Sequence, residues 1–77
     1  MIRIEKDSFS PTCSLDRDWY GWAFADGKRI GVIWHPKGEY RFVEDFDRRK
    51  HSRENRPRSI RANSIRELKT KLAGEVW

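Results

Sequence analysis

Cysteine is almost absent from this chain of 77 residues. Cys13 is the single cysteine, so the chain forms no internal disulfide, and no cysteine pair suggests a structural zinc site. Small domains often depend on such cross-links or on oligomerisation. Dense packing of large side chains is the remaining source of stability within the chain. The four Trp, four Phe and two Tyr are suited to that packing.

Long apolar runs are also missing. No stretch approaches the roughly 18 apolar residues of a membrane-spanning helix. The first six residues alternate apolar and charged side chains instead of forming the apolar centre of a signal peptide. We therefore expect a cytoplasmic protein, in which a lone cysteine stays reduced. The length favours one small domain over residues 1–77.

Charge is distributed unevenly along the chain. Residues 1–47 hold 7 Lys/Arg and 9 Asp/Glu, a net charge of −2, whereas residues 48–77 hold 10 Lys/Arg and 3 Asp/Glu, a net charge of +7. A basic segment of this kind indicates a polyanionic partner. A solvated, charge-rich loop and helix face is the alternative explanation.

Three β-type runs predict an antiparallel meander over residues 19–46; they are Trp19 to Phe24, Arg29 to Trp34 and Glu39 to Phe46. The linkers Ala25-Asp26-Gly27 and Pro36-Lys37-Gly38 are each three residues ending in glycine, which is typical of a hairpin loop with a left-handed glycine. A two-residue Asp26-Gly27 turn is the alternative. We disfavour it because it places Trp22 opposite Gly31 and scatters the apolar side chains over both faces.

The three-residue loops predict two unlike faces for this sheet. The apolar face, which we expect to form the core, would hold Tyr20, Trp22, Phe24, Ile30, Val32, Trp34, Tyr40 and Phe42. The second face would stay open and would hold Trp19, Gly21, Ala23, Arg29, Gly31, Ile33, Arg41 and Val43.

The rest of the chain adds an edge strand, an arm and a helix. Residues 1–6 suit a short N-terminal edge strand, residues 47–58 a basic flexible arm in which nothing packs, and residues 59–62 a brief extended return. A helix is expected over 64–73, with a capping box of Ser64 and Glu67, an apolar stripe extending to Val76 and a left-handed cap at Gly74. The expected fold is thus α+β, a three-stranded antiparallel meander, with a fourth edge strand as an option, packed on one C-terminal helix.

The open face and the arm together suggest a small, non-enzymatic module that binds DNA or RNA. Trp19, Arg29 and Arg41 would meet bases or groove edges, because aromatic rings stack on bases and arginine pairs with guanine or phosphate. Seven cations fall within residues 48–61, and such runs attract phosphates by releasing counterions. The expected phosphate-binding side chains are Arg48, Arg49, Lys50, Arg53, Arg56, Arg58, Arg61, Arg66 and Lys69.

A topological resemblance supports this interpretation. Three antiparallel strands followed by a helix, over about residues 19–73, resemble the architecture of integrase arm-binding and plant ethylene-response DNA-binding domains. Such domains meet DNA with the open face of the sheet. Single-strand-binding coactivators have a similar β-then-α order. The likeness concerns strand order alone and assigns no residue.

Two other classes remain open. A protein-interaction module, such as a small phage- or mobile-element-type regulator, would use a patch of Trp19, Ile33 and Val43 to hold an acidic protein or a second copy of the chain. An enzyme is disfavoured, although Glu44, Asp45 and Asp47 lie near His51 in a pattern that could hold Mg²⁺. Solvated carboxylates at a strand end explain that cluster more simply, so we expect no catalytic residue, metal or cofactor.

Overall fold

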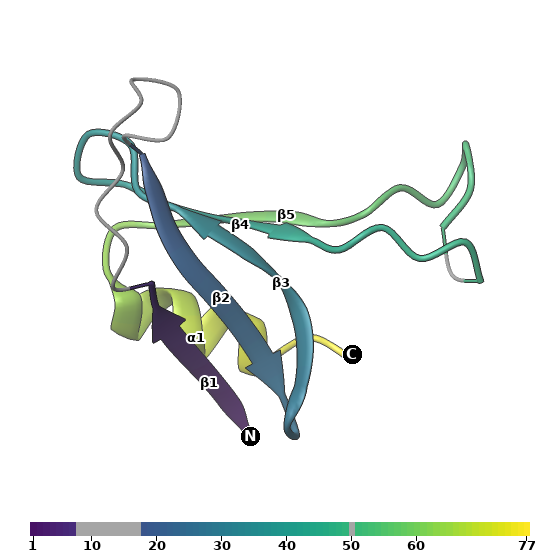
Figure 1. The fold of residues 1–77 in the computed structure, drawn as a ribbon, viewed down its shortest axis with the longest axis horizontal. Helices are drawn as coiled ribbons and strands as arrows, with labels where there is room; N and C mark the ends of the chain where they lie inside the picture. The colour runs from purple at the N-terminus through teal and green to yellow at the C-terminus, as the bar shows by residue number, and fades with distance from the viewer. Residues whose placement is uncertain (8–17, 50) are drawn as a thin grey trace.

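A computed structural model describes residues 1–7, 18–49 and 51–77 of the protein (Figure 1). Within these residues it contains one antiparallel sheet with the strand order β1-β2-β3-β4-β5 and one C-terminal helix, α1, so the α+β class is confirmed. The sheet has more strands than expected, since the extended return pairs with β4. The strands are β1 Ile2–Lys6, β2 Trp19–Ala25, β3 Lys28–Trp34, β4 Tyr40–Glu44 and β5 Ser59–Ala62, and the helix is Ile65–Ala73.

The hairpin between β2 and β3 turns on two residues, so the predicted three-residue loop is wrong. Ala25 pairs with Lys28, and the two residues between them have positive φ angles, 52° at Asp26 and 82° at Gly27. Positive φ at both central positions defines a type I′ turn, whose twist matches that of the flanking strands. Aspartate and glycine tolerate this conformation better than other residues do, which is why the shorter turn forms.

The second hairpin also turns on two residues, Lys37 and Gly38, and this changes which side chains share a face. Val32 lies opposite Val43 and Ile33 opposite Phe42, whereas the predicted loop set Val32 opposite Phe42. Trp22 lies opposite Val32 and Ala23 opposite Gly31, and the register shifts once at each end of the β2–β3 pair. Each predicted face is therefore split. Half of the expected open set is buried, namely Gly21, Ala23, Gly31 and Ile33, and half of the expected core set lies on the opposite face, namely Trp22, Phe24, Val32 and Trp34.

Small side chains on the buried face allow the helix to approach the sheet. Ala23, Ile33 and Phe42 are fully buried there, together with Leu68 and Leu72 of α1. The helix packs against β5, β1 and β4. Tryptophan rings at the positions of Gly21, Ala23 and Gly31 would not fit in this layer, which explains physically why the tryptophans face the other way.

The helix ends differ from expectation in detail. The Ser64 hydroxyl accepts a hydrogen bond from the Glu67 N–H, but the Glu67 carboxylate accepts from Asn63 instead of closing the box on Ser64. Gly74 has φ −80° and ψ −5°, so the predicted left-handed cap is wrong. Val76 is 88% exposed, so the apolar stripe ends before it.

Trp77 closes the C-terminal end of the core. Its indole N–H donates a hydrogen bond to the Leu72 carbonyl at 2.7 Å, and its ring packs edge to face on Phe42 with centroids 5.3 Å apart. The last residue of the chain thus covers the end of the buried layer.

The packing predicts opposite outcomes for two glycine-to-alanine changes. A Cβ at Gly31 would collide with the Val43 carbonyl and the buried Phe42 ring, whereas a Cβ at Gly74 would stay at ordinary contact distance, 3.5 Å from the Lys71 carbonyl. We expect Gly31→Ala to lower the free energy of unfolding by about 2 kcal/mol or more, and Gly74→Ala to change it by less than about 0.5 kcal/mol. Urea denaturation of both variants measures this, and equal losses would contradict the packing described.

Candidate functional site

Three tryptophans gather on the sheet face opposite the helix. The Trp19 ring packs edge to face on Trp22, with centroids 5.6 Å apart, and on Trp34, with centroids 5.1 Å apart. The Trp19 indole N–H donates to the Asp7 carboxylate at 2.8 Å, which fixes the orientation of the ring. All three side chains are partly buried, so part of each indole remains accessible to a ligand.

Trp22 and Trp34 were missed as site residues because the predicted register placed them in the core. The dipeptide Lys37-Gly38 was the signal that could have found them. Read as a two-residue turn, it sets Val32 opposite Val43 instead of Phe42, so the buried Phe42 lies on the other face. Trp22 and Trp34 then follow, because Trp22 pairs with Val32 and Trp34 alternates onto the same face of β3.

Arginines surround the tryptophans on the same face. Arg3, on β1, holds its guanidinium 4.4 Å above the Phe24 ring. Arg29 lies opposite Phe24 and donates to both carboxylate oxygens of Asp45, at 2.8 and 3.2 Å. That hydrogen-bonded pairing raises the pKa of Arg29, so its charge is permanent.

Arg41 and Arg61 face each other across β4 and β5 beside Trp34. Both reach the Glu39 carboxylate, at 3.9 Å from Arg41 and 3.6 Å from Arg61. One carboxylate therefore serves two guanidinium groups, and this end of the face keeps a net positive charge. Arg41 Nε is buried without a hydrogen-bond partner in the part of the chain that the structure describes.

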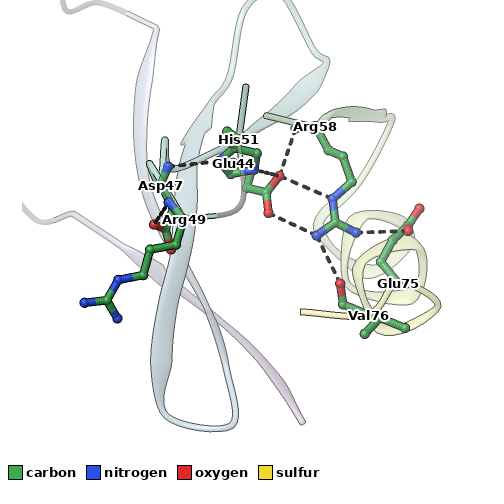
Figure 2. Close-up of polar contacts among 7 residues, drawn as sticks. All are labelled: Glu44, Asp47, Arg49, His51, Arg58, Glu75 and Val76. Carbon is green, nitrogen blue, oxygen red and sulfur yellow. Dashed lines mark hydrogen bonds and ion pairs between the residues drawn. The ribbon is translucent and has the colours of Figure 1, made fainter. Parts of the chain in front are cut away.

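The segment between β4 and β5 projects away from the sheet as an arm, residues 45–58 (Figure 1). Its exposed arginines form no ion pair within the described residues, and Figure 2 shows the Arg49 side chain pointing away from the polar cluster at the base of the arm. The predicted site residue Lys50 lies outside the described residues. Four guanidinium groups of the arm have no ion pair among the described residues and are called free below, those of Arg48, Arg49, Arg53 and Arg56.

The base of the arm is held by a buried polar cluster, so the expectation that nothing in residues 47–58 packs is wrong. Arg58 donates to Glu44 three times, from its backbone N–H at 3.0 Å, from Nε at 3.3 Å and from Nη2 at 3.0 Å (Figure 2). Its guanidinium also stacks 3.8 Å above the Trp77 ring and donates to Glu75 and to the Val76 carbonyl. Arg58 is thus occupied inside the protein and is less available for phosphates than was expected.

His51, seven residues after Glu44 in the chain, completes the cluster. Its Nδ1 accepts the Asp47 backbone N–H at 2.8 Å, so the proton resides on Nε2, which donates to Glu44 Oε1 at 3.1 Å. The side chains of His51 and Glu44 are only 5% and 7% exposed. Burial by itself would raise the pKa of Glu44, but the hydrogen bonds from Arg58 and His51 outweigh it and lower that pKa to about 2.

The acidic residues of the arm do not assemble a metal site. Glu44 and His51 bind each other, and Asp45 is paired with Arg29. Across residues 1–7, 18–49 and 51–77, no three His, Cys, Asp or Glu side chains are placed to hold an ion. The idea of a solvated carboxylate at the strand end is also wrong for Glu44, which is buried.

Apart from Arg58, which is held by Glu44, and Lys50, which lies outside the described residues, the predicted site residues separate into three groups. Trp19, Arg29, Arg41 and Arg61 share the open sheet face, and the four free arginines project on the arm. Arg66 and Lys69 are exposed on α1, which lies across the sheet from the tryptophans. The structure does not bring these two helix cations to the face that the prediction combined them with.

No protein-family model, curated protein or solved structure matches this chain. The resemblance to integrase arm-binding domains depended on a three-stranded order, and the five-stranded sheet departs from it. The one helix in the described part of the chain is too short to cross a membrane.

The Glu44 cluster predicts acid sensitivity with a defined sign. Because the folded-state pKa of Glu44 lies near 2, against an ordinary value of 4.5, its contribution to stability is complete above about pH 4.5 and disappears as the pH falls towards 2. We expect Glu44→Gln to destabilise the protein by roughly 2–3 kcal/mol at pH 7. The difference from the wild type should shrink steadily from pH 4.5 to pH 2.

Glu75→Gln is the matched control, because Glu75 also pairs with Arg58 but is 45% exposed. We expect it to change the free energy of unfolding by less than about 1 kcal/mol. Denaturant titrations of both variants from pH 2 to pH 7 measure the effect. A Glu44→Gln difference that stays constant over this range would show that the carboxylate charge plays no part.

Proposed function

We propose that this protein is a small, non-enzymatic nucleic-acid-binding module that uses the tryptophan face of its sheet and its basic arm. The tryptophan face consists of Trp19, Trp22 and Trp34 with the surrounding Arg3, Arg29, Arg41 and Arg61. The observation that carries the proposal is the cluster of three indoles on the face away from the helix. Within the described residues, no helix or strand packs over that face.

Unpaired bases fit such a surface better than a closed duplex does. Stacking of one base on an aromatic side chain contributes about 1–3 kcal/mol and is available to every base. In a duplex the base faces are already stacked on one another. The arginines around the indoles would contact phosphates while the bases lie on the rings, as in other sheet surfaces that bind single strands.

The arm supplies the long-range attraction. Its four free arginines lie on a projecting segment, where a phosphate chain can approach from several directions. Each phosphate that they neutralise releases condensed counterions, so binding should weaken steeply with added salt. No aromatic side chain lies among these arginines, which suits backbone contact and gives no means of reading sequence.

Replacing the four free arm arginines by glutamine should flatten the salt dependence. If the arm contacts about four phosphates, the slope of log affinity against log salt becomes shallower by about 3 to 4. Fluorescence anisotropy with mixed-sequence single strands and duplexes at several salt concentrations measures the slope.

Arg66→Gln combined with Lys69→Gln is the charge control, because both residues lie on the helix side of the sheet. We expect this double variant to leave the slope nearly unchanged. The absence of binding by the wild type at low salt would overturn the proposed function. An equal effect of the control would assign the binding to net charge alone.

A protein-interaction surface is the second candidate. Tryptophan and arginine are the residues that most often dominate protein interfaces, and both are gathered on the tryptophan face. The partner would be an acidic protein or a second copy of this chain, since the face carries an excess of arginine.

Trp19→Ala separates the two candidates, because Trp19 touches both other indoles. If the face binds bases, we expect single-strand affinity to fall at least about fivefold with no change in oligomeric state. A dimeric wild type that becomes monomeric on substitution would favour the interface instead. Sedimentation velocity and anisotropy measure these outcomes, and Trp19→Phe, which retains a ring, is the matched variant.

A further inference from the structure

A cavity of about 550 Å³ lies where the arm leaves the sheet. The pairing of β3 with β4 ends at Gly31 and Glu44, and one more backbone bond joins Asp45 to Ile30 at 2.9 Å. Beyond that bond the β2–β3 hairpin and the arm diverge (Figure 1). The cavity is lined by residues from both segments, and its volume is within the range of small-molecule sites.

Several cationic side chains that line the cavity have no carboxylate partner within the described residues. Glu44 is bound by Arg58 and His51, and Asp45 is bound by Arg29. The remaining carboxylate, Asp47, accepts the Arg49 backbone N–H at 2.9 Å. The other charged lining residues form no ion pair within the described chain; they are Lys28, Arg48 and Arg49.

One wall of the cavity is aromatic. Phe46 is 65% exposed, which is unusual for a phenylalanine, and it lines the cavity together with Ile30 and Trp77. The Phe46 ring has His51 on one side, with centroids 5.9 Å apart. The remaining exposed ring surface is available to a planar ligand.

We propose that this cavity binds a single nucleotide, with the base against Phe46 and the phosphate on Lys28, Arg48 and Arg49. A nucleotide has a flat aromatic base, which can pack on the Phe46 ring, and an anionic phosphate, which can pair with the cations of the lining. The inference rests on the proposed function for its ligand class, but it concerns a cavity beside the tryptophan face, to which Arg29 contributes while the three indoles of that face do not. The nucleotide is either free or part of a bound strand.

The four indole N–H signals of the ¹⁵N-labelled protein report on the two surfaces separately. Trp77 lines the cavity, whereas the other three indoles belong to the tryptophan face. Adenosine 5′-monophosphate should shift the Trp77 signal in a saturable, one-to-one manner. Adenosine and inorganic phosphate should each bind at least about fivefold more weakly, because each provides only one of the two contacts.

Two substitutions and two controls test the assigned contacts. Phe46→Ala and Lys28→Gln should each weaken binding of the nucleotide at least about fivefold. Val76→Ala and Lys69→Gln remove an exposed apolar group and an exposed cation that do not line the cavity, and they should leave affinity unchanged. An unshifted Trp77 signal, equal binding of inorganic phosphate, or an unaffected Phe46→Ala variant would each overturn the assignment.

Titration with a short oligonucleotide shows whether the bound nucleotide is free or part of a strand. It also tests the cavity and the tryptophan face independently of each other. If the oligonucleotide displaces adenosine 5′-monophosphate from the cavity, the occupant is a nucleotide of the strand, and if it does not, the cavity takes a free nucleotide. An oligonucleotide that shifts the other three indoles while the mononucleotide leaves Trp77 unmoved overturns the cavity alone. The reverse pattern overturns the tryptophan face alone.

Discussion

The register of the strands is the constraint on which the rest of the structure depends. Both hairpins close on two residues with positive φ angles, Asp26-Gly27 and Lys37-Gly38. Because side chains alternate along a strand, the pairing of β3 with β4 places Ile33 and Phe42 on the face that meets the helix. Glycines and an alanine share that face and the tryptophans lie on the other, so the core layer is thin and the opposite face is aromatic.

A second constraint connects the arm to this sheet. Glu44, the last residue of β4, is buried and accepts hydrogen bonds from two residues of the arm, His51 and Arg58. A buried carboxylate without partners would be strongly unfavourable, so the two arm segments are held where they satisfy it. Arg58 also reaches the C-terminal segment and stacks on Trp77. The arm base, the end of the sheet and the chain terminus are thereby joined in one cluster.

The same cluster separates the structural cations from the free ones. Arg58 is occupied by Glu44, and Arg29 by Asp45, whereas the arginines further out on the arm have no carboxylate partner within the described residues. The basic segment therefore has a fixed base and an unneutralised outer part. That division supports the proposed role, in which the outer part contacts a polyanion while the base fixes the arm to the end of the sheet.

Local signals in the sequence determined the element types and the charged part of the proposed binding surface. The alternation in residues 1–6, the β-type runs and the pattern that begins at Ser64 act over a few residues, and the charge of the arm can be counted directly. The hairpin turns were local too, but the two readings of each differ by one residue, and apolar patterning could not choose between them because both faces carry large apolar side chains. Only the tertiary structure decided that small residues lie on the helix side, since the Val43 carbonyl and the buried Phe42 ring lie against Gly31 and exclude a larger side chain there. It also decided that Glu44 is buried, because its partners come from residues 7 and 14 positions further along the chain.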